Sequence, residues 1–114
     1  MKQWRVRLSR AAEADFSAIV AWTATHFGNV QAQKYAEVLT LSITALHDGP
    51  NVIGAKTRDD ISHGLKSLHV ARRGSKGSHF VIFRAATDNT IDVLRVLHES
   101  MDLARHLPSE NLQH

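Results

Sequence analysis

The sequence contains no cysteine and only two prolines, and its aromatic residues are four Phe, two Trp and one Tyr among 114 residues. The absence of cysteine excludes disulfides and thiolate metal sites. No segment approaches the roughly 20 apolar residues that a membrane span needs, and residues 1–8 alternate apolar and charged side chains, unlike a signal peptide. We therefore expect a soluble, cytoplasmic protein that does not bind membranes, folded as one domain over residues 1–114.

Charge is unevenly distributed along the chain, although the net charge is only +3. The net charge is +1 over residues 1–50, +5 over residues 51–87 and −3 over residues 88–114. A basic centre of this kind favours an anionic partner, either nucleic acid or an acidic protein segment. The other interpretation is a solvated surface without a partner. The basic residues of the centre are Lys56, Arg58, Lys66, Arg72, Arg73, Lys76 and Arg84.

Hydrophobic periodicity in the first half predicts a strand followed by two helices. Residues 4–8 alternate as a strand buried on one face. Ser9 can cap a helix that ends at Gly28, and Asn29 can cap a second helix that ends at residues 49–50. Because about two residues join the helices, we expect an antiparallel hairpin with inward-facing apolar stripes. These stripes comprise Phe16, Ile19, Val20, Thr23 and Phe27, and then Ala32, Tyr35, Ala36, Leu39, Ile43 and Leu46.

The second half of the sequence predicts three strands. Residues 51–63 lack periodicity and are expected to form a loop. Strands are expected over residues 65–70, 80–84 and 90–97, with a basic turn at residues 72–78. The third of these strands is apolar on both faces, as is typical of the centre of a sheet.

A short helix is expected from about Ser100 to Leu107, where Pro108 ends it. It follows His98, a side chain that can gain or lose a proton near neutral pH. The predicted fold is therefore of the α+β class. It has an N-terminal strand, an antiparallel helical hairpin packed on an antiparallel sheet, and a short C-terminal helix.

Three segments carry a resemblance to a known family. They are Gly64–Leu68, Ser78–Arg84 and the strand-to-tail junction Leu94–Leu107. Together they resemble the toxins of bacterial type II toxin-antitoxin systems in the RelE/ParE superfamily, and within it the ParE branch. The resemblance implies the same order of elements, a basic concave sheet surface opposite the helices, and neutralisation by an antitoxin in a hetero-oligomer.

The resemblance leaves two activities open. RelE-like members are ribosome-dependent mRNA endoribonucleases, whereas ParE-like members inhibit DNA gyrase and have no nuclease activity. Metal-free RNA cleavage needs a group that activates the ribose 2′-hydroxyl, cations that stabilise the phosphate, and an acid for the leaving oxygen. The candidate catalytic residues for that reaction are Lys66, Arg84, Arg95 and His98.

The segment after the last strand favours the ParE branch. Glu99 and Ser100 stand where RelE has basic residues, and a carboxylate there repels the scissile phosphate. His98 followed by Met101 and Asp102 is similar to the ParE pattern. We therefore predict a ParE-like toxin that binds DNA gyrase. The alternatives are a RelE-like ribonuclease acting on mRNA at the ribosome and a non-toxic, partner-binding member.

The residues expected to bind the antitoxin or the target are Lys66, Arg72, Arg73, Lys76, Arg84, His98, Met101 and Asp102. We expect an acidic antitoxin segment to lie across the basic block. Structural roles are the other interpretation, since His98 can bond a neighbouring carbonyl and Arg95 can pair with Asp92 or Asp102. The eight histidines show no paired ligand spacing, so no metal or other cofactor is predicted.

Overall fold

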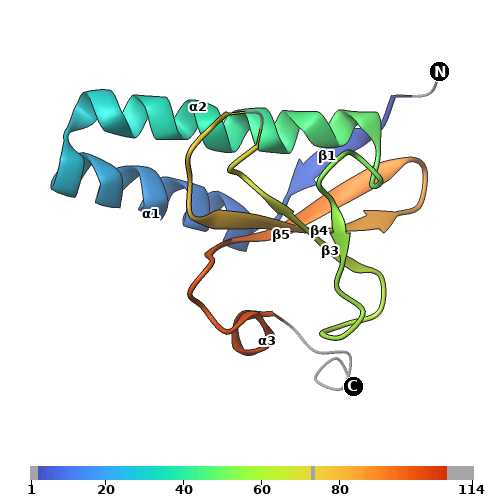
Figure 1. Cartoon of the computed structure of the whole chain (residues 1–114). Helices are drawn as coiled ribbons and strands as arrows, with labels where there is room; N and C mark the ends of the chain where they lie inside the picture. Colours follow the sequence, from blue (N-terminus) through green and yellow to red (C-terminus); the bar gives the residue numbers. More distant parts are fainter. Residues whose placement is uncertain (1–2, 73, 108–114) are drawn as a thin grey trace.

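The computed structural model describes residues 3–72 and 74–107, and its elements follow the predicted order (Figure 1). In chain order they are β1 (Arg5–Leu8), α1 (Arg10–Phe27), α2 (Asn29–Ala45), the 3₁₀ helix η1 (Leu46–Asp48), β2 (Lys56–Thr57), β3 (Leu65–His69), β4 (His79–Ala86), β5 (Thr90–His98) and α3 (Leu103–His106). The α+β class, the N-terminal strand, the helical hairpin and the short C-terminal helix are confirmed. No described helix is long and apolar enough to cross a membrane.

The five strands form one sheet in the order β1-β5-β4-β3-β2. β5 lies between β1 and β4, so it is an interior strand as its two apolar faces predict, although the central strand of the five is β4. The pairs from β2 to β5 are antiparallel, as expected, but β1 pairs with β5 in parallel, so the sheet is mixed. Apolar alternation specifies which face of a strand is buried and contains no information on the direction of its neighbour.

Local signals explain most of the hairpin. The Ser9 hydroxyl accepts a hydrogen bond from the Ala12 amide at 3.0 Å and caps α1, as predicted. Gly28 ends α1 with a φ of 92°, a conformation that favours glycine. The same glycine is the N-cap of α2, so the prediction that Asn29 caps this helix was wrong by one residue.

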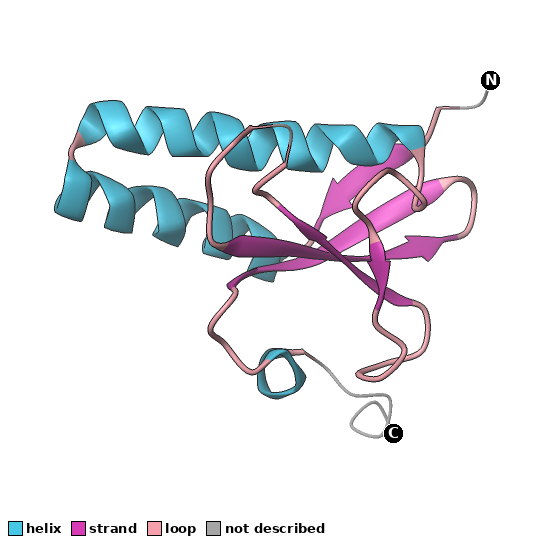
Figure 2. Ribbon diagram, viewed as in Figure 1, coloured by secondary structure: helices cyan, strands magenta, loops and turns pink. Residues whose placement is uncertain are grey.

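The sheet is covered on both faces (Figure 2). The helical hairpin packs on one face over the larger core, which comprises Ala12, Leu39, Leu46, Leu68, Val70, Val81, Phe83, Ile91, Val93 and Val96. On the opposite face α3 covers a smaller cluster made by Leu65, Ile82, Leu97, Leu103 and Leu107. Burial of these side chains is the main favourable contribution to the stability of the fold. The resemblance implied that the face opposite the hairpin is a basic surface. In the structure this face is partly apolar, because the smaller cluster lies there beside Arg84.

Three further predicted details differ from the structure. Phe27 is 66% exposed, because the tip of the hairpin extends beyond the sheet (Figure 1). Residues 51–63 contain the two-residue strand β2, which pairs with β3. The tail helix begins at Leu103, where the carboxylate of Asp102 caps it by accepting from the Ala104 amide at 3.1 Å. Pro108, predicted to end that helix, lies outside the described residues.

Candidate functional site

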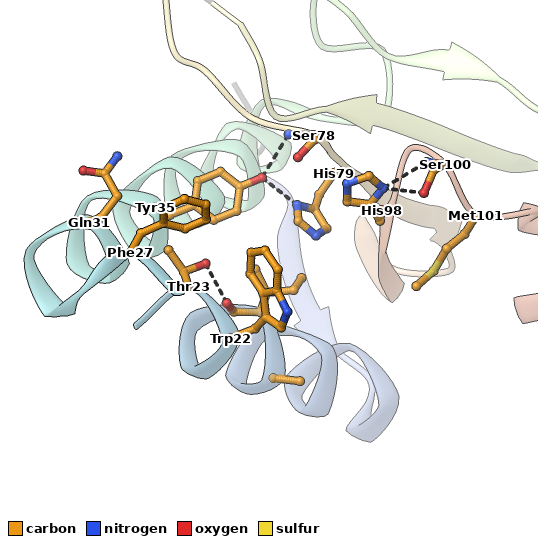
Figure 3. A pocket seen from close by; sticks show the side chains of 12 residues that line it. Trp22, Thr23, Phe27, Gln31, Tyr35, Ser78, His79, His98, Ser100 and Met101 are labelled. Atoms are coloured by element: carbon orange, nitrogen blue, oxygen red, sulfur yellow. Dashed lines mark hydrogen bonds between the residues drawn. The ribbon is translucent and has the colours of Figure 1, made fainter. Parts of the chain in front are cut away.

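A groove of about 920 Å³ lies between the helical hairpin and the ends of β4 and β5 (Figure 3). Helix α1 contributes Trp22 and Phe27 to it, and α2 contributes Tyr35. His79 at the start of β4 and His98 at the end of β5 are directly paired across the two strands. Side chains alternate along a strand, so both imidazoles share the hairpin face with Val81 and Val96. Strand pairing and helix packing thus bring five residues from four elements to one site.

Hydrogen bonds fix the protonation of His79. The amide of Ser78 donates to the Tyr35 hydroxyl oxygen at 3.1 Å, so the hydroxyl proton is free to point at Nδ1 of His79, 2.6 Å away. Burial, together with the charge of nearby His98, lowers the pKa of His79 from 6.5 to about 4. Burial also raises the pKa of Tyr35, which keeps its proton. His79 is therefore neutral at physiological pH, with Nδ1 accepting and the proton on Nε2.

His98 has the same arrangement with different partners. Its Nδ1 accepts from the Ser100 amide at 3.1 Å and lies 2.7 Å from the Ser100 hydroxyl. The rings of His79 and His98 meet edge to face, with centroids 5.1 Å apart. Because Nδ1 accepts in both residues, Nε2 of each ring is an N–H donor.

Aromatic and sulfur-containing side chains form the apolar wall of the groove. Trp22, Phe27 and Met101 are 56%, 66% and 43% exposed. The Trp22 ring stacks on His26 at 4.1 Å between centroids and meets the edge of Phe27 at 5.8 Å. Large apolar side chains gathered at one exposed place are typical of an interaction site.

Two of the predicted catalytic cations lie on opposite faces of the sheet. Lys66 pairs with Phe83 across β3 and β4, whereas Arg84 pairs with the preceding residue, Leu65. Successive residues of a strand point to opposite faces. The Lys66 ammonium donates to the Asn51 side chain at 3.3 Å, and the Arg84 guanidinium donates to the Ser62 hydroxyl at 2.7 Å. The two cations therefore cannot face one phosphate group in this arrangement.

Arg95 is held by bonds within the fold. Its Nε and Nη2 donate to the two carboxylate oxygens of Asp15 on α1 at 2.7 and 2.9 Å, and its Nη1 donates to the His106 carbonyl at 2.9 Å. The hydrogen bond that Arg95 donates to Asp15 also raises the pKa of Arg95. The structural interpretation of Arg95 is thus supported, but neither predicted partner, Asp92 or Asp102, is the one found. Arg95 joins β5 to α1 and to α3.

Arg72 and Lys76, the described basic residues of the loop between β3 and β4, do not line the groove. The Arg72 guanidinium donates to the Ile53 carbonyl at 3.2 Å, on the loop before β2. Lys76 is exposed. Arg73 lies outside the described residues. Since Lys66 and Arg84 lie on opposite faces, the described residues of the basic block do not form one continuous surface.

Of the predicted binding residues, His98 and Met101 line the groove and Asp102 caps α3. The sequence does not single out the other groove residues, because Tyr35 falls in the apolar stripe of its helix and His79 lies in no motif with paired ligand spacing. One signal was available for Trp22, which stands outside the apolar stripe of its helix and still carries a large aromatic side chain.

A metal centre is not found in the part of the chain that the structure describes. There, no group of three or more His, Cys, Asp or Glu residues is positioned to hold a metal ion. In both groove histidines Nδ1 already bonds a group of this chain, Tyr35 or Ser100, so this nitrogen is not available to a metal ion. The chemistry available in the groove is hydrogen-bond donation beside an apolar wall.

Two solved structures share this fold. One is described as the chromosomal ParDE TA system from P. aeruginosa, with a TM-score of 0.68 and 19% identity over 86% of this chain and 98% of that chain. The other is the toxin-antitoxin complex RelBE2 from Mycobacterium tuberculosis, with a TM-score of 0.56 and 17% identity over 84% of this chain and 98% of that chain. The fold is thus one found among the proteins of toxin-antitoxin systems.

Sequence comparison identifies the family. The family described as ParE toxin of type II toxin-antitoxin system, parDE, matches residues 6–103. Toxin ParE1 of Mycobacterium tuberculosis is 35% identical over 103 residues, 90% of this chain and 97% of its own. Toxin ParE1 of Caulobacter vibrioides is 32% identical over 101 residues, 89% of this chain and 95% of its own. The chain belongs to the ParE toxin family of type II toxin-antitoxin systems, which confirms the resemblance seen in the sequence.

Proposed function

We propose that this toxin acts in the cytoplasm by binding DNA gyrase, without cleaving RNA, and that a cognate antitoxin neutralises it in a hetero-oligomer. Gyrase inhibition is the activity that the ParE resemblance of residues 98–102 implies. An antitoxin partner is supported by the shared fold, since the solved relatives are described as toxin-antitoxin systems and complexes.

The separation of the candidate catalytic residues carries the proposal. Lys66 and Arg84 lie on opposite faces of the sheet, and Arg95 donates to Asp15 and to a backbone carbonyl. Phosphoryl chemistry depends on cations that are already positioned around the developing charge. These residues do not provide such an arrangement.

The groove itself also disfavours the ribonuclease alternative. His79 and His98 resemble an acid-base pair, but the described residues that line the groove include neither Lys nor Arg. Glu99, next to His98, accepts a hydrogen bond from His69 at 2.6 Å and contributes negative charge close to the pair. A phosphate would therefore meet no cationic side chain from the lining and one nearby carboxylate.

An assay with purified components separates the two activities. The toxin should inhibit supercoiling of plasmid DNA by gyrase or trap gyrase on cleaved DNA, and an excess of the cognate antitoxin should reverse this effect. The same preparation should leave mRNA on stalled ribosomes uncut. Site-specific cuts in that mRNA, together with unimpaired gyrase, would establish the ribonuclease alternative instead.

A further inference from the structure

We propose that the tight turn at residues 52–55 contacts duplex DNA, with the side chain of Ile53 inserted at a base step and with Lys66 and Arg72 on the flanking phosphates. The inference rests on the proposed function for its setting, because gyrase is an enzyme that holds DNA. It adds DNA as a second partner of the toxin, and the binding that it predicts can be measured on DNA alone.

The turn presents a large apolar side chain to solvent. The Ala55 amide donates to the Val52 carbonyl at 2.9 Å, which closes a turn with Ile53 and Gly54 in its central positions. Gly54 has a φ of 97°, a positive value like that of the third residue of a type II turn. Turns favour small or polar residues, yet Ile53 is 78% exposed, the largest exposed fraction among the large apolar side chains of the described residues.

Contacts on several sides hold the turn in place. Val52 packs against the larger core. A side chain at Gly54 would lie 3.2 Å from Cδ1 of Leu68, so the backbone of the turn lies directly against β3. Arg72 donates from Nη2 to the Ile53 carbonyl at 3.2 Å. The Ile53 side chain therefore projects from a fixed backbone, and little conformational freedom is lost when it enters a partner.

Cations stand on both sides of the turn. The Lys66 ammonium donates to the Asn51 side chain just before the turn, and the Arg72 guanidinium donates to a carbonyl within it. Each of these bonds uses one of several N–H donors of its cation, so others can reach an anionic partner. Lys56 follows the turn on β2 and is exposed. Residues 49–58 contain no Asp or Glu, so the turn lies in a segment of positive charge.

Duplex DNA matches an apolar tip between cations. A single exposed apolar side chain is by itself ordinary on a protein surface. Phosphates lie on both sides of every base step, however, so a side chain that enters the step brings its neighbouring cations to the backbone. Between Leu41 and Met101, Ile53 is the one large apolar side chain of the described residues that is exposed. The turn therefore offers a wedge, as in proteins that kink DNA, and not a patch that a protein segment could cover.

The phosphate contacts are tested by the salt dependence of DNA binding. Binding of the purified toxin to a short fluorescent duplex is measured by anisotropy over a series of salt concentrations. We expect Lys66→Gln and Arg72→Gln each to reduce the slope of log affinity against log salt by about 1, because each removes one phosphate contact. The matched control is Arg7→Gln, which removes an exposed cation on β1 and should leave the slope unchanged.

The insertion is tested by Ile53→Ser on a duplex that carries 2-aminopurine, whose fluorescence rises when its base is unstacked. We expect the wild type to raise this fluorescence. Ile53→Ser should lose the rise and bind about tenfold more weakly, with its salt slope unchanged. The control is Leu41→Ser, because Leu41 is 64% exposed on α2. Both side chains are exposed, so the melting temperature should stay close to that of the wild type.

Two results would overturn the inference. The first is wild-type toxin that does not bind DNA at low salt, or that binds it with the same salt slope and fluorescence as all of the turn variants. The second is unchanged DNA binding in these variants with weaker binding to the cognate antitoxin or to gyrase free of DNA, which would assign the turn to an acidic protein surface. DNA binding with the expected losses, beside gyrase that supercoils normally, would support the turn and contradict the proposed function.

Discussion

Arg95 and His98 lie three residues apart on the same strand, and their surroundings differ in one decisive respect. The Arg95 guanidinium uses Nε, Nη1 and Nη2 to bond Asp15 and the His106 carbonyl. The His98 ring uses Nδ1 within the fold, and no hydrogen bond of the described structure uses its Nε2. A polar group whose nitrogens all bond within the fold stabilises the architecture, whereas a positioned donor without a partner is available to a ligand. The comparison distinguishes the structural site at Arg95 from the candidate functional site at His98, where residue type does not.

The largest effect on stability is expected at the structural site. Asp15→Ala removes the acceptor of Arg95 and also of the Val96 amide, which donates to Asp15 at 2.9 Å. Because both donors are partly buried, we expect a loss of about 2–3 kcal/mol in the free energy of unfolding. Urea denaturation measures it.

The control for that variant is Asp92→Ala, which breaks the exposed pair with Arg7. Exposed ion pairs contribute little to stability, so this variant should lose much less than Asp15→Ala. Equal losses in the two variants would mean that Arg95 does not hold α1 and β5 together.

A smaller loss of stability is expected from Tyr35→Phe. The variant keeps the aromatic ring but removes the acceptor for the Ser78 amide and the donor to His79. We expect a loss of about 1–2 kcal/mol in the free energy of unfolding, again from urea denaturation. An unchanged stability would show that these two hydrogen bonds do not hold α2 against β4.

The low pKa of His79 predicts a pH dependence. Its pKa is about 4 in the folded protein and 6.5 in the unfolded chain, so the unfolded state binds the proton more readily between these values. Stability should therefore be unaffected by this group above pH 6.5 and should fall as the pH decreases towards about 4, by about 1 kcal/mol because the ring is half-exposed to solvent. Melting temperatures of the wild type and of His79→Gln across this range measure the difference. The two proteins should converge at low pH, and parallel curves would contradict the assignment.

Among these variants, His98→Ala is expected to have the smallest effect on stability. Its effect on toxicity separates a binding mechanism from a catalytic one. If toxicity depends on a binding surface, this variant should lose only part of it, because contacts are shared among several residues. A catalytic acid would behave differently, since its removal lowers a rate by roughly 100- to 10,000-fold. Growth arrest on induction without antitoxin, at matched toxin levels, is the measurement. Complete loss of toxicity in a folded variant would favour the ribonuclease alternative.

The sequence by itself determined the class of fold and the family. Alternating and helical periods located the strands and the hairpin, Ser9 and Gly28 marked the bounds of α1, and the segment from His98 to Asp102 pointed to ParE. These signals are local, because they depend on residues that are neighbours along the chain. For this reason they were accessible without a structure.

Only the tertiary structure decided which distant residues meet. Tyr35 and His79 are 44 residues apart, and Arg95 and Asp15 are 80 apart. Neither contact has a sequence signal, since each depends on the strand order and on the way the hairpin packs on the sheet. The same holds for Lys66 and Arg84, whose opposite faces follow from the register of β3 and β4. A periodic pattern specifies the buried face of each element, but the contacts between elements are set by topology and register.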